Sequence, residues 1–298
     1  MTPPIPYVRN MTVDYGVVER LSPLIRRIIA RNPSPFTFHG TGTYIVGNGA
    51  VAVIDPGPAL DDHVQAILDG LDPGETVSHQ IITHTHRDHS PAARLLGVAT
   101  GAKTYGFGPH GSGNADGVVE EGADHDFTPD VTLRDGDIIE GDGWSLTAVH
   151  TPGHTSNHLC FALEEESVLF SGDHVMGWSS TVIVPPDGDM AAYLASLRRL
   201  LARDDKRYWP THGPAIENPK LLVQAYIDHR TMREEQITDC LKRGVTGIPA
   251  MVEIMYADVP QNLHPAAACS VLAHLIHMVE QGRATCDGPP RADGVFGL

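Results

Sequence analysis

The chain has 298 residues, and its apolar, glycine and proline contents are those of ordinary globular proteins, which excludes a disordered or fibrous chain. Lys and Arg number 21 against 37 Asp and Glu, so the net charge is −16, and such an acidic surface disfavours tight nucleic-acid binding. We find no apolar run of about 18 residues, so we expect no membrane-spanning segment. The first residues do not combine a basic start with an apolar stretch, so we expect no secretory signal and a cytoplasmic location.

The first half of the chain predicts alternating strands and helices. Residues 42–54 have the composition of two β-strands joined by a glycine-containing tight turn. A helix is expected over about 59–71, and a strand follows at 80–83. The next helix is predicted to have Ser90 as its N-cap and Pro91 at its first position, because these residue types favour those positions.

The second half predicts strands first and helices afterwards. Asp189 can cap a helix whose apolar residues recur at helical spacing, and a further helix is expected over 218–244. The strands that precede them are expected at 145–150, 158–163 and 167–171.

This order of elements predicts an α/β fold with a small helical domain at its end. We expect a catalytic domain over 1–228. The remaining residues, 229–298, predict two or three packed helices that form a separate C-terminal domain.

The segment after the strand at 80–83 is crowded with titratable side chains. It reads "QIITHTHRDHSPAA" and includes His84, His86, Asp88 and His89. A polar surface loop that is rich in histidine would explain it. A loop that binds metal would also explain it, because imidazole and carboxylate groups are zinc ligands.

Other strand ends carry residues of the same kinds. His154, Asp173 and His212 each follow an apolar strand or strand-like run, on a turn that contains Gly or Pro. Alone, each is more often a turn residue or a packed side chain than a ligand. Loops at strand ends are nevertheless where an α/β scaffold holds a site, so the combination predicts one metal site built from several turns.

Together these motifs resemble the metal site of the metallo-β-lactamase superfamily. The resemblance covers nearly the whole chain and is greatest to the subfamily of β-lactamase-like protein 2. It implies a four-layer αββα fold with a winged-helix-like C-terminal domain. The segments that carry it are "NPSPFTFHGTGTYIVG", "TPGHTSNH", "SGDHVMG", "GPAIENPKLLVQAYIDHRTMREEQI" and "VEIMYADVPQNLHPAAACSVLAHL".

The resemblance implies a site for two zinc ions. Manganese or iron also suit such ligands, so the metal is less determined than the ligand set. Asp55, at the end of its own strand, would orient a ligand histidine, and a plain turn aspartate is the alternative. The implied ligands are His84, His86 and His154 for the first ion, Asp88, His89 and His212 for the second, and Asp173 as the bridge.

Such a site implies metal-assisted hydrolysis. A water between two Lewis acids ionises near neutral pH, so a metal-bridging hydroxide would be the nucleophile, without a catalytic serine or cysteine. Asp88 would help to position this hydroxide. His174, next to Asp173, and His158 could touch substrate or donate a proton, and a supporting role is the alternative for both.

Two further residues are expected near the substrate, and two others are not. Trp178 lies in a loop expected to border the site, and simple packing is the alternative. His229 could reach the site from its helix, and an exposed or packed helix histidine is the alternative. His274 and His277 are expected on the surface of a C-terminal helix.

Three functions compete at this point. The first is hydrolysis of a small ester, lactone, thioester or amide, and the second is cleavage of single-stranded RNA, which the animal members of the resembling subfamily imply. The third, an iron-dependent redox reaction, is the weakest. RNA is disfavoured because residues 231–298 hold five Lys and Arg against eight Asp and Glu, a net charge of −3 where phosphate binding calls for basic residues. We therefore expect a small-molecule substrate, and a homo-oligomer remains a further expectation.

Overall fold

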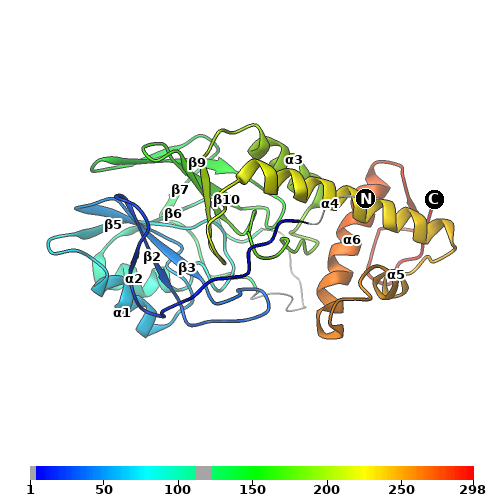
Figure 1. The fold of residues 1–298 in the computed structure, drawn as a ribbon, viewed down its shortest axis with the longest axis horizontal. Helices are drawn as coiled ribbons and strands as arrows, with labels where there is room; N and C mark the ends of the chain where they lie inside the picture. The colour runs from blue at the N-terminus through cyan, green and yellow to red at the C-terminus, as the bar shows by residue number, and fades with distance from the viewer. Residues whose placement is uncertain (1–4, 112–121) are drawn as a thin grey trace.

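The computed structural model of the protein describes residues 5–111 and 122–298, and it contains two large β-sheets (Figure 1). The first sheet is antiparallel from β1 to β4 and parallel from β4 to β7. The predicted pair of strands within 42–54 is confirmed as β3 and β4. In sheet order, the strands described are β1 (Glu19–Arg20), β2 (Ile25–Ile29), β3 (Gly42–Val46), β4 (Ala50–Ile54), β5 (Thr76–Ile81), β6 (Lys103–Gly106) and β7 (Val131–Thr132).

The second sheet includes the three strands predicted in the second half of the chain. Its order is β12-β11-β10-β9-β8, and its pairs are antiparallel except for β11 and β12. The strands are β8 (Ile138–Gly141), β9 (Trp144–His150), β10 (Leu159–Leu163), β11 (Val168–Gly172) and β12 (Arg207–Pro210).

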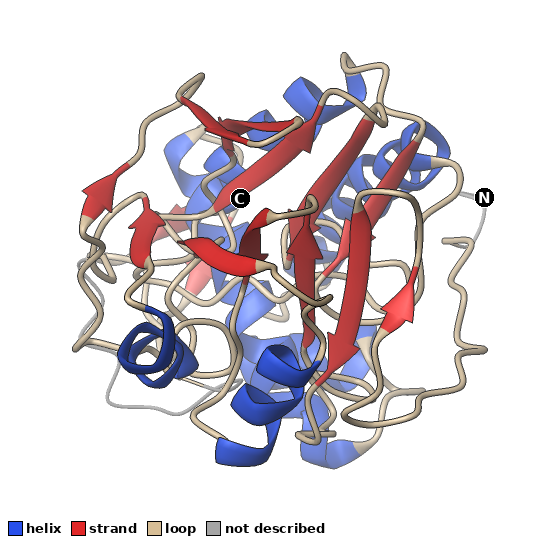
Figure 2. Cartoon of the chain, turned by 90° about the vertical axis from the view of Figure 1, so that its left-hand side faces the viewer, coloured by secondary structure: helices blue, strands red, loops and turns tan. Residues whose placement is uncertain are grey.

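The two sheets pack face to face and helices cover their outer faces, as Figure 2 shows. Alternation along the strands produces this layering, because successive side chains point to opposite faces of a sheet. In β4, for example, Ala52 and Ile54 belong to the core between the sheets, together with Phe161 of β10. Val51 and Val53 belong to the core under the outer helices. The predicted αββα arrangement is therefore present.

In the described part of the chain, four helices pack on these sheets, and the last of them continues into the C-terminal lobe. Apolar residues of α1 (Asp61–Asp69) and α2 (Ala92–Thr100) pack on the first sheet. Those of α3 (Met190–Leu201) and α4 (Pro219–Lys242) pack on the second. The Asp189 side chain accepts a hydrogen bond from the backbone of Ala192, so the predicted N-cap of α3 is confirmed.

Two local predictions near the site are wrong. The strand expected at 80–83 is β5, which starts earlier and ends at Ile81, because the Thr83 backbone N–H turns away and donates to Asp55 Oδ1 at 2.8 Å. Ser90 does not cap α2: its hydroxyl donates to Asp124 Oδ2 at 2.7 Å, and the helix begins after Pro91.

The last part of the chain forms a lobe with its own core. The long helix α4 runs from the second sheet into this lobe (Figure 1), where Ile237 and Cys240 join the lobe's core. The proposed boundary after residue 228 lies inside α4 and stays a prediction. The other elements of the lobe are α5 (Ile248–Met255), the short η1 (Gln261–Leu263), α6 (His264–Glu280) and the paired strands β13 (Thr285–Cys286) and β14 (Phe296–Gly297).

The prediction that His274 and His277 lie on a helix surface is wrong. Both are buried, because α6 packs against α4 and turns the two rings toward Glu234 of α4. Glu234 Oε1 accepts hydrogen bonds from Nδ1 of His274 at 3.2 Å and of His277 at 2.7 Å, while Oε2 pairs with Arg283. We call these four residues the Glu234 cluster.

Within the described part of the chain, no helix combines the length and apolarity that crossing a bilayer requires.

Candidate metal centre

The residues predicted as metal ligands meet at one end of the two sheets. They lie in the turns that follow β5, β9, β11 and β12, so strands far apart in sequence bring them together. Their nitrogen and oxygen atoms form three overlapping groups in which all ligand atoms lie within 4.8 Å of one another. The groups are His84, His86 and His154; His84, His89 and Asp173; and Asp88, His89 and His212.

The first group consists of imidazoles alone. His86 Nδ1 lies 3.0 Å from His84 Nε2 and 3.2 Å from His154 Nε2. Burial lowers the pKa of all three rings, so they are neutral near pH 7. Three neutral rings that turn nitrogen atoms toward one point suit a cation, because neutral imidazole is the form that binds metal.

The third group adds a carboxylate, that of Asp88. His212 Nε2 lies 3.1 Å and His89 Nε2 3.4 Å from Asp88 Oδ2. Burial opposes ionisation of Asp88, but His89 and His212 outweigh it and hold the pKa of this carboxyl far below its usual range. Burial likewise opposes the charge on His212, and Asp173 and Asp88 raise its pKa to about 10.

Asp173, which belongs to the remaining group, lies between the first and third groups. Its Oδ2 is 3.3 Å from His212 Nε2, 3.5 Å from His89 Nε2 and 3.9 Å from His154 Nε2. Its other oxygen, Oδ1, and His89 Nε2 are buried and make no hydrogen bond to the residues described. Buried polar atoms without partners are costly, so these atoms fit a bound cation. The structure therefore brings all seven predicted ligands together.

Hydrogen bonds from outside the cluster fix the rings. Asp55 Oδ2 accepts from His89 Nδ1 at 2.9 Å, which is the orienting contact expected of Asp55. His154 Nδ1 donates to the Val182 carbonyl at 2.9 Å, and His212 Nδ1 donates to the Gly40 carbonyl at 3.1 Å. In each ring the Nδ1 contact leaves Nε2 free to face the cluster.

Sequence reasoning missed the two threonines that hold Asp55. The Thr83 hydroxyl donates to Asp55 Oδ2 at 2.8 Å, and the Thr211 hydroxyl donates to the same oxygen at 3.0 Å. The only sequence signal for either is that it directly precedes a predicted ligand, His84 or His212.

His158 and His174 lie behind the cluster. His158 Nε2 accepts a hydrogen bond from the Asp173 backbone N–H at 3.2 Å, and its Nδ1 lies 2.9 Å from the Thr151 hydroxyl, so this ring supports the turn. His174 is fully buried against the ring of Tyr193, and burial lowers its pKa to about 3. A catalytic role for His174 stays a prediction, and its position away from the cavity wall does not favour it.

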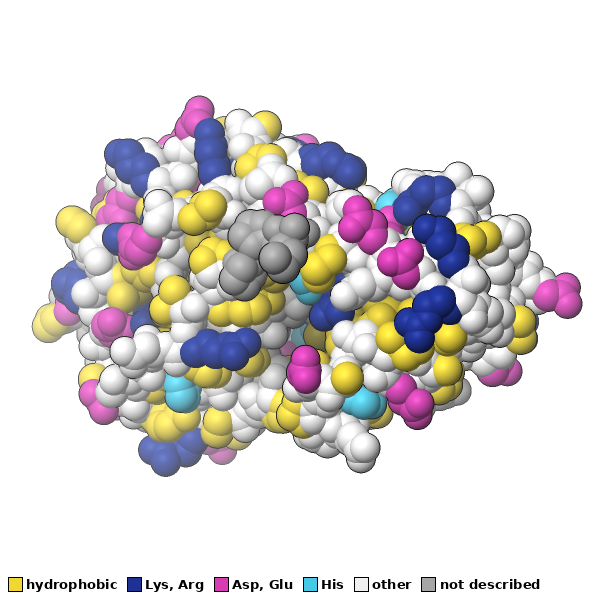
Figure 3. All heavy atoms as spheres, turned by 45° about the vertical axis from the view of Figure 1, so that its right-hand side comes forward, with side chains coloured by type: hydrophobic (Ala, Val, Ile, Leu, Met, Phe, Trp, Pro, Cys, Tyr) yellow, Lys and Arg dark blue, Asp and Glu magenta, His cyan; other side chains and the backbone are white. Residues whose placement is uncertain are grey.

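A cavity of about 620 Å³ opens onto the cluster between the sheets and the C-terminal lobe. In Figure 3 it is a hollow with histidine side chains at its bottom. Its wall includes the metal-site residues His86, Asp88, Asp173 and His212. Trp178 and His229, predicted near the substrate, both line it, although Trp178 also stacks on Phe38 with ring centroids 4.8 Å apart.

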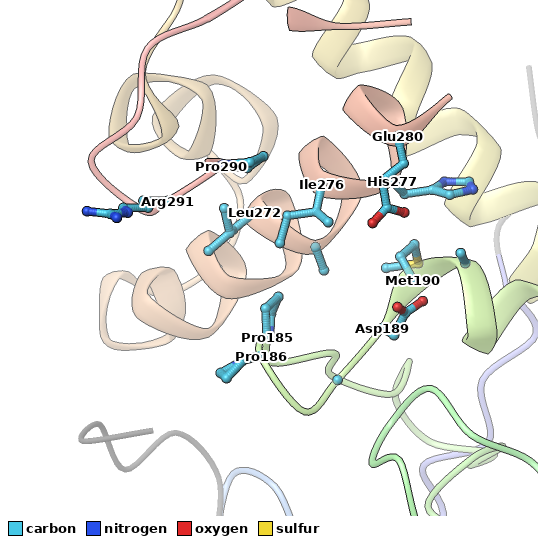
Figure 4. A pocket seen from close by; sticks show the side chains of 13 residues that line it. Pro185, Pro186, Asp189, Met190, Leu272, Ile276, His277, Glu280, Pro290 and Arg291 are labelled. Carbon is cyan, nitrogen blue, oxygen red and sulfur yellow. The ribbon is translucent and has the colours of Figure 1, made fainter. Parts of the chain in front are cut away.

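A second cavity, of about 450 Å³, lies between α6 and the loop before α3 (Figure 4). Pro185, Pro186 and Met190 line one side, and Leu272, Ile276 and His277 line the other. None of the predicted metal ligands borders it, so the chemistry of the metal centre belongs to the larger cavity.

Comparison with known proteins places these features in context. Residues 37–212 match the family described as the metallo-beta-lactamase superfamily, and residues 248–289 match the beta-lactamase associated winged helix domain. The beta-lactamase-like protein 2 homolog of Drosophila melanogaster is 32% identical, over 89% of this chain and 91% of its own. The atrochrysone carboxyl ACP thioesterase of Paecilomyces divaricatus is 33% identical, over 76% of this chain and 67% of its own.

Solved structures share the fold over nearly the whole chain. A beta-lactamase domain protein from Burkholderia ambifaria gives a TM-score of 0.80 at 19% identity and covers 97% of this chain and 95% of that one. A metallo-beta-lactamase family protein from Thermus thermophilus gives a TM-score of 0.75 at 22% identity and covers 93% of this chain and 99% of that one. The predicted αββα fold and winged-helix C-terminal domain are confirmed.

Proposed function

The chain belongs to the metallo-β-lactamase superfamily, and we propose that it is a hydrolase that uses two zinc ions to cleave a small acyl compound. The compound would be an ester, lactone, thioester or amide. The observation that carries the proposal is the position of Asp173, which lies 3.3 Å from His212 and 3.9 Å from His154 and so faces both groups of ligands.

The donor set supports zinc as the metal. It consists of imidazole nitrogens and carboxylate oxygens without thiolate, which zinc accepts, and manganese or iron are the alternatives. When bound, two such ions supply Lewis-acid activation of a water molecule and polarisation of the substrate carbonyl.

Asp88 is the residue best placed to act on the attacking water. It lines the cavity, and its low pKa means that it is ionised near neutral pH, so it can accept a hydrogen bond from this water and orient it. The Thr41 hydroxyl donates to Asp88 Oδ2 at 3.3 Å and restricts rotation of the carboxylate. We therefore assign Asp88 a positioning role in addition to metal binding.

The cavity wall favours an acyl compound over RNA. Its volume is that of a small-molecule site, and much of the wall is apolar, which suits an acyl chain. The C-terminal lobe carries the net charge of −3 described above, which opposes a polyanion. Among acyl compounds we favour a thioester, because one relative is named a thioesterase. The apolar wall residues include Ile5, Phe36, Met176, Val259 and Leu263.

The test compares substrates on one preparation of zinc-loaded protein. We expect hydrolysis of short acyl thioesters of N-acetylcysteamine, measured through the thiol released, and no cleavage of labelled single-stranded RNA at physiological salt. Asp88→Ala is the matched variant and should lose the activity. Cleavage of RNA by the parent protein but not by the variant would replace the acyl proposal with a ribonuclease.

A further inference from the structure

Two arginines of α4 lie in the wall of the large cavity and have no acidic partner among the described residues. Arg230 and Arg233 lie one helical turn apart on α4, and both line the cavity that contains Asp88 and Asp173. Neither guanidinium forms an ion pair with a carboxylate among residues 5–111 and 122–298. Buried charges in proteins are normally paired, so the buried charge of Arg230 requires an explanation.

Arg230 is the more buried of the two, with 2% of its surface exposed. One terminal nitrogen donates to the Thr181 carbonyl, and the guanidinium lies 5.2 Å from the ring centroid of Tyr193. Its Nε is buried and makes no hydrogen bond to the described residues. A carbonyl and an aromatic ring lower the cost of burying this charge, but they do not neutralise it.

The acidic side chain one turn after Arg230 on α4 makes its contacts elsewhere. Glu234 follows Arg233 directly and lies one turn after Arg230, yet it faces His274, His277 and Arg283. The i,i+4 spacing on α4 would allow Glu234 to pair with Arg230. Because α6 packs on α4, Glu234 instead contacts the two histidines and Arg283.

Arg233 extends the same positive wall. Its Nη1 donates to the Met255 carbonyl at 3.0 Å, and the guanidinium lies 4.2 Å from the ring centroid of Tyr256, while its Nε has no partner among the described residues. His229, the next cavity residue on α4, also has a buried Nδ1 without a partner there. Burial and the neighbouring arginines lower its pKa to about 3, so the ring is neutral and can donate a hydrogen bond.

We propose that Arg230 and Arg233 bind an oxyanion of the substrate, a carboxylate or a phosphate ester, in the cavity that the metal-site residues also line. Guanidinium groups bind both anions through paired N–H donors, and the unpartnered Nε atoms leave donors available. This inference rests on the proposed hydrolysis and narrows its substrate to an acyl compound with a negative charge away from the scissile bond.

Binding of thioether analogues tests the inference without any reaction, because a thioether cannot be hydrolysed. The probes form two matched pairs, measured by calorimetry on the zinc-loaded protein. S-butyl-N-acetylcysteamine is compared with S-(4-carboxybutyl)-N-acetylcysteamine for the carboxylate. S-butyl-pantetheine is compared with its 4′-phosphate for the phosphate. We expect the charged member of one pair to bind at least about tenfold more tightly than its neutral partner, since hydrogen bonds to charged groups are strong.

Variants test whether the arginines cause that preference for the charged probe. Arg233→Gln and Arg230→Gln should each reduce the ratio of the two affinities about tenfold. Arg243→Gln, which changes an exposed arginine at the end of the same helix, is the control and should leave the ratio unchanged. If Arg230→Gln does not fold, Arg233→Gln alone decides. Equal binding of charged and neutral probes, or a preference that survives both substitutions, overturns the inference. Arginine-dependent binding without thioester hydrolysis would contradict the proposed activity while leaving the anion site in place.

Discussion

The metal-ligand cluster at the sheet ends and the Glu234 cluster in the C-terminal lobe are both built from buried carboxylate and histidine side chains. In the first, Asp173 Oδ1 and His89 Nε2 lack hydrogen-bond partners among the described residues, and the cluster faces a cavity. In the second, both oxygens of Glu234 accept hydrogen bonds and Arg283 supplies the opposite charge, although His274 Nε2 also lacks a hydrogen-bond partner among the described residues and His277 borders the second cavity. Residue type therefore does not distinguish a binding centre from a structural one, but an unpartnered buried carboxylate oxygen, which only the first cluster has, does.

The largest effect is expected from removing the bridge between the ligand groups. Asp173→Ala should lose at least one of the two zinc ions and lower kcat/KM by about 1,000-fold or more, because both groups lose a shared ligand. Metal content by mass spectrometry and thioester hydrolysis check this. Glu253→Ala, which changes an exposed acidic residue on α5, is the control. Two tightly held zinc ions and full activity in Asp173→Ala would refute the bridging assignment.

The Glu234 cluster should make stability depend on pH. Burial lowers the pKa of His274 from 6.5 to about 4, and although burial opposes it, hydrogen bonds from His274, His277 and Arg283 lower that of Glu234 from 4.5 to about 2. In both cases the unfolded chain takes up the proton at higher pH than the folded protein, so acidification favours unfolding. From pH 6.5 to about 4, His274 alone should remove up to about 3 kcal/mol from the free energy of unfolding.

Urea unfolding at several pH values measures this dependence, with chelator in every sample so that zinc release does not contribute. His274→Gln should flatten the dependence above about pH 4.5. An unchanged slope in the variant would mean that other groups cause the acid sensitivity.

A smaller loss of stability is expected when Glu234 loses its charge. Glu234→Gln should lower the free energy of unfolding by about 2–3 kcal/mol at pH 7, because Arg283 and the two histidines lose an ionised acceptor. Zinc content should remain that of the parent protein, since this cluster holds no proposed ligand. Loss of zinc in folded Glu234→Gln would show that the Glu234 cluster also supports the metal centre and is not purely structural.

The smallest effect should come from the threonines that hold Asp55. Thr211→Val keeps the side-chain shape and removes one hydrogen bond to Asp55 Oδ2, so His89 is oriented less firmly. Zinc affinity should weaken about tenfold, as is typical when a partner of a ligand is removed. Competition with a chromogenic chelator measures this. An affinity equal to that of the parent protein would show that the bond from Thr83 suffices.

The layers and the ligand set could be predicted from sequence because they depend on local patterns. The composition of residues 42–54 and their glycine-containing turn indicated two strands, and each predicted ligand lies in a turn that follows a strand and takes its position from that strand. The contacts of α6 with α4 could not be predicted this way. His274 and His277 have helical spacing typical of an exposed face, and only tertiary packing turns them toward Glu234. Arg230 and Arg233 were missed for the same reason, because their lack of an acidic partner among the described residues is a property of the folded cavity.

The continuity of α4 has a consequence for how this protein can change in evolution or design. One helix packs Leu222 on the second sheet, carries Arg230 into the cavity wall and anchors Ile237 in the C-terminal core. A single inserted residue would turn everything after it by about 100° and move it along the axis by about 1.5 Å. Insertions are therefore tolerable in the surface loops but not between these positions, and the substrate range can be altered there only by substitution at constant helix length.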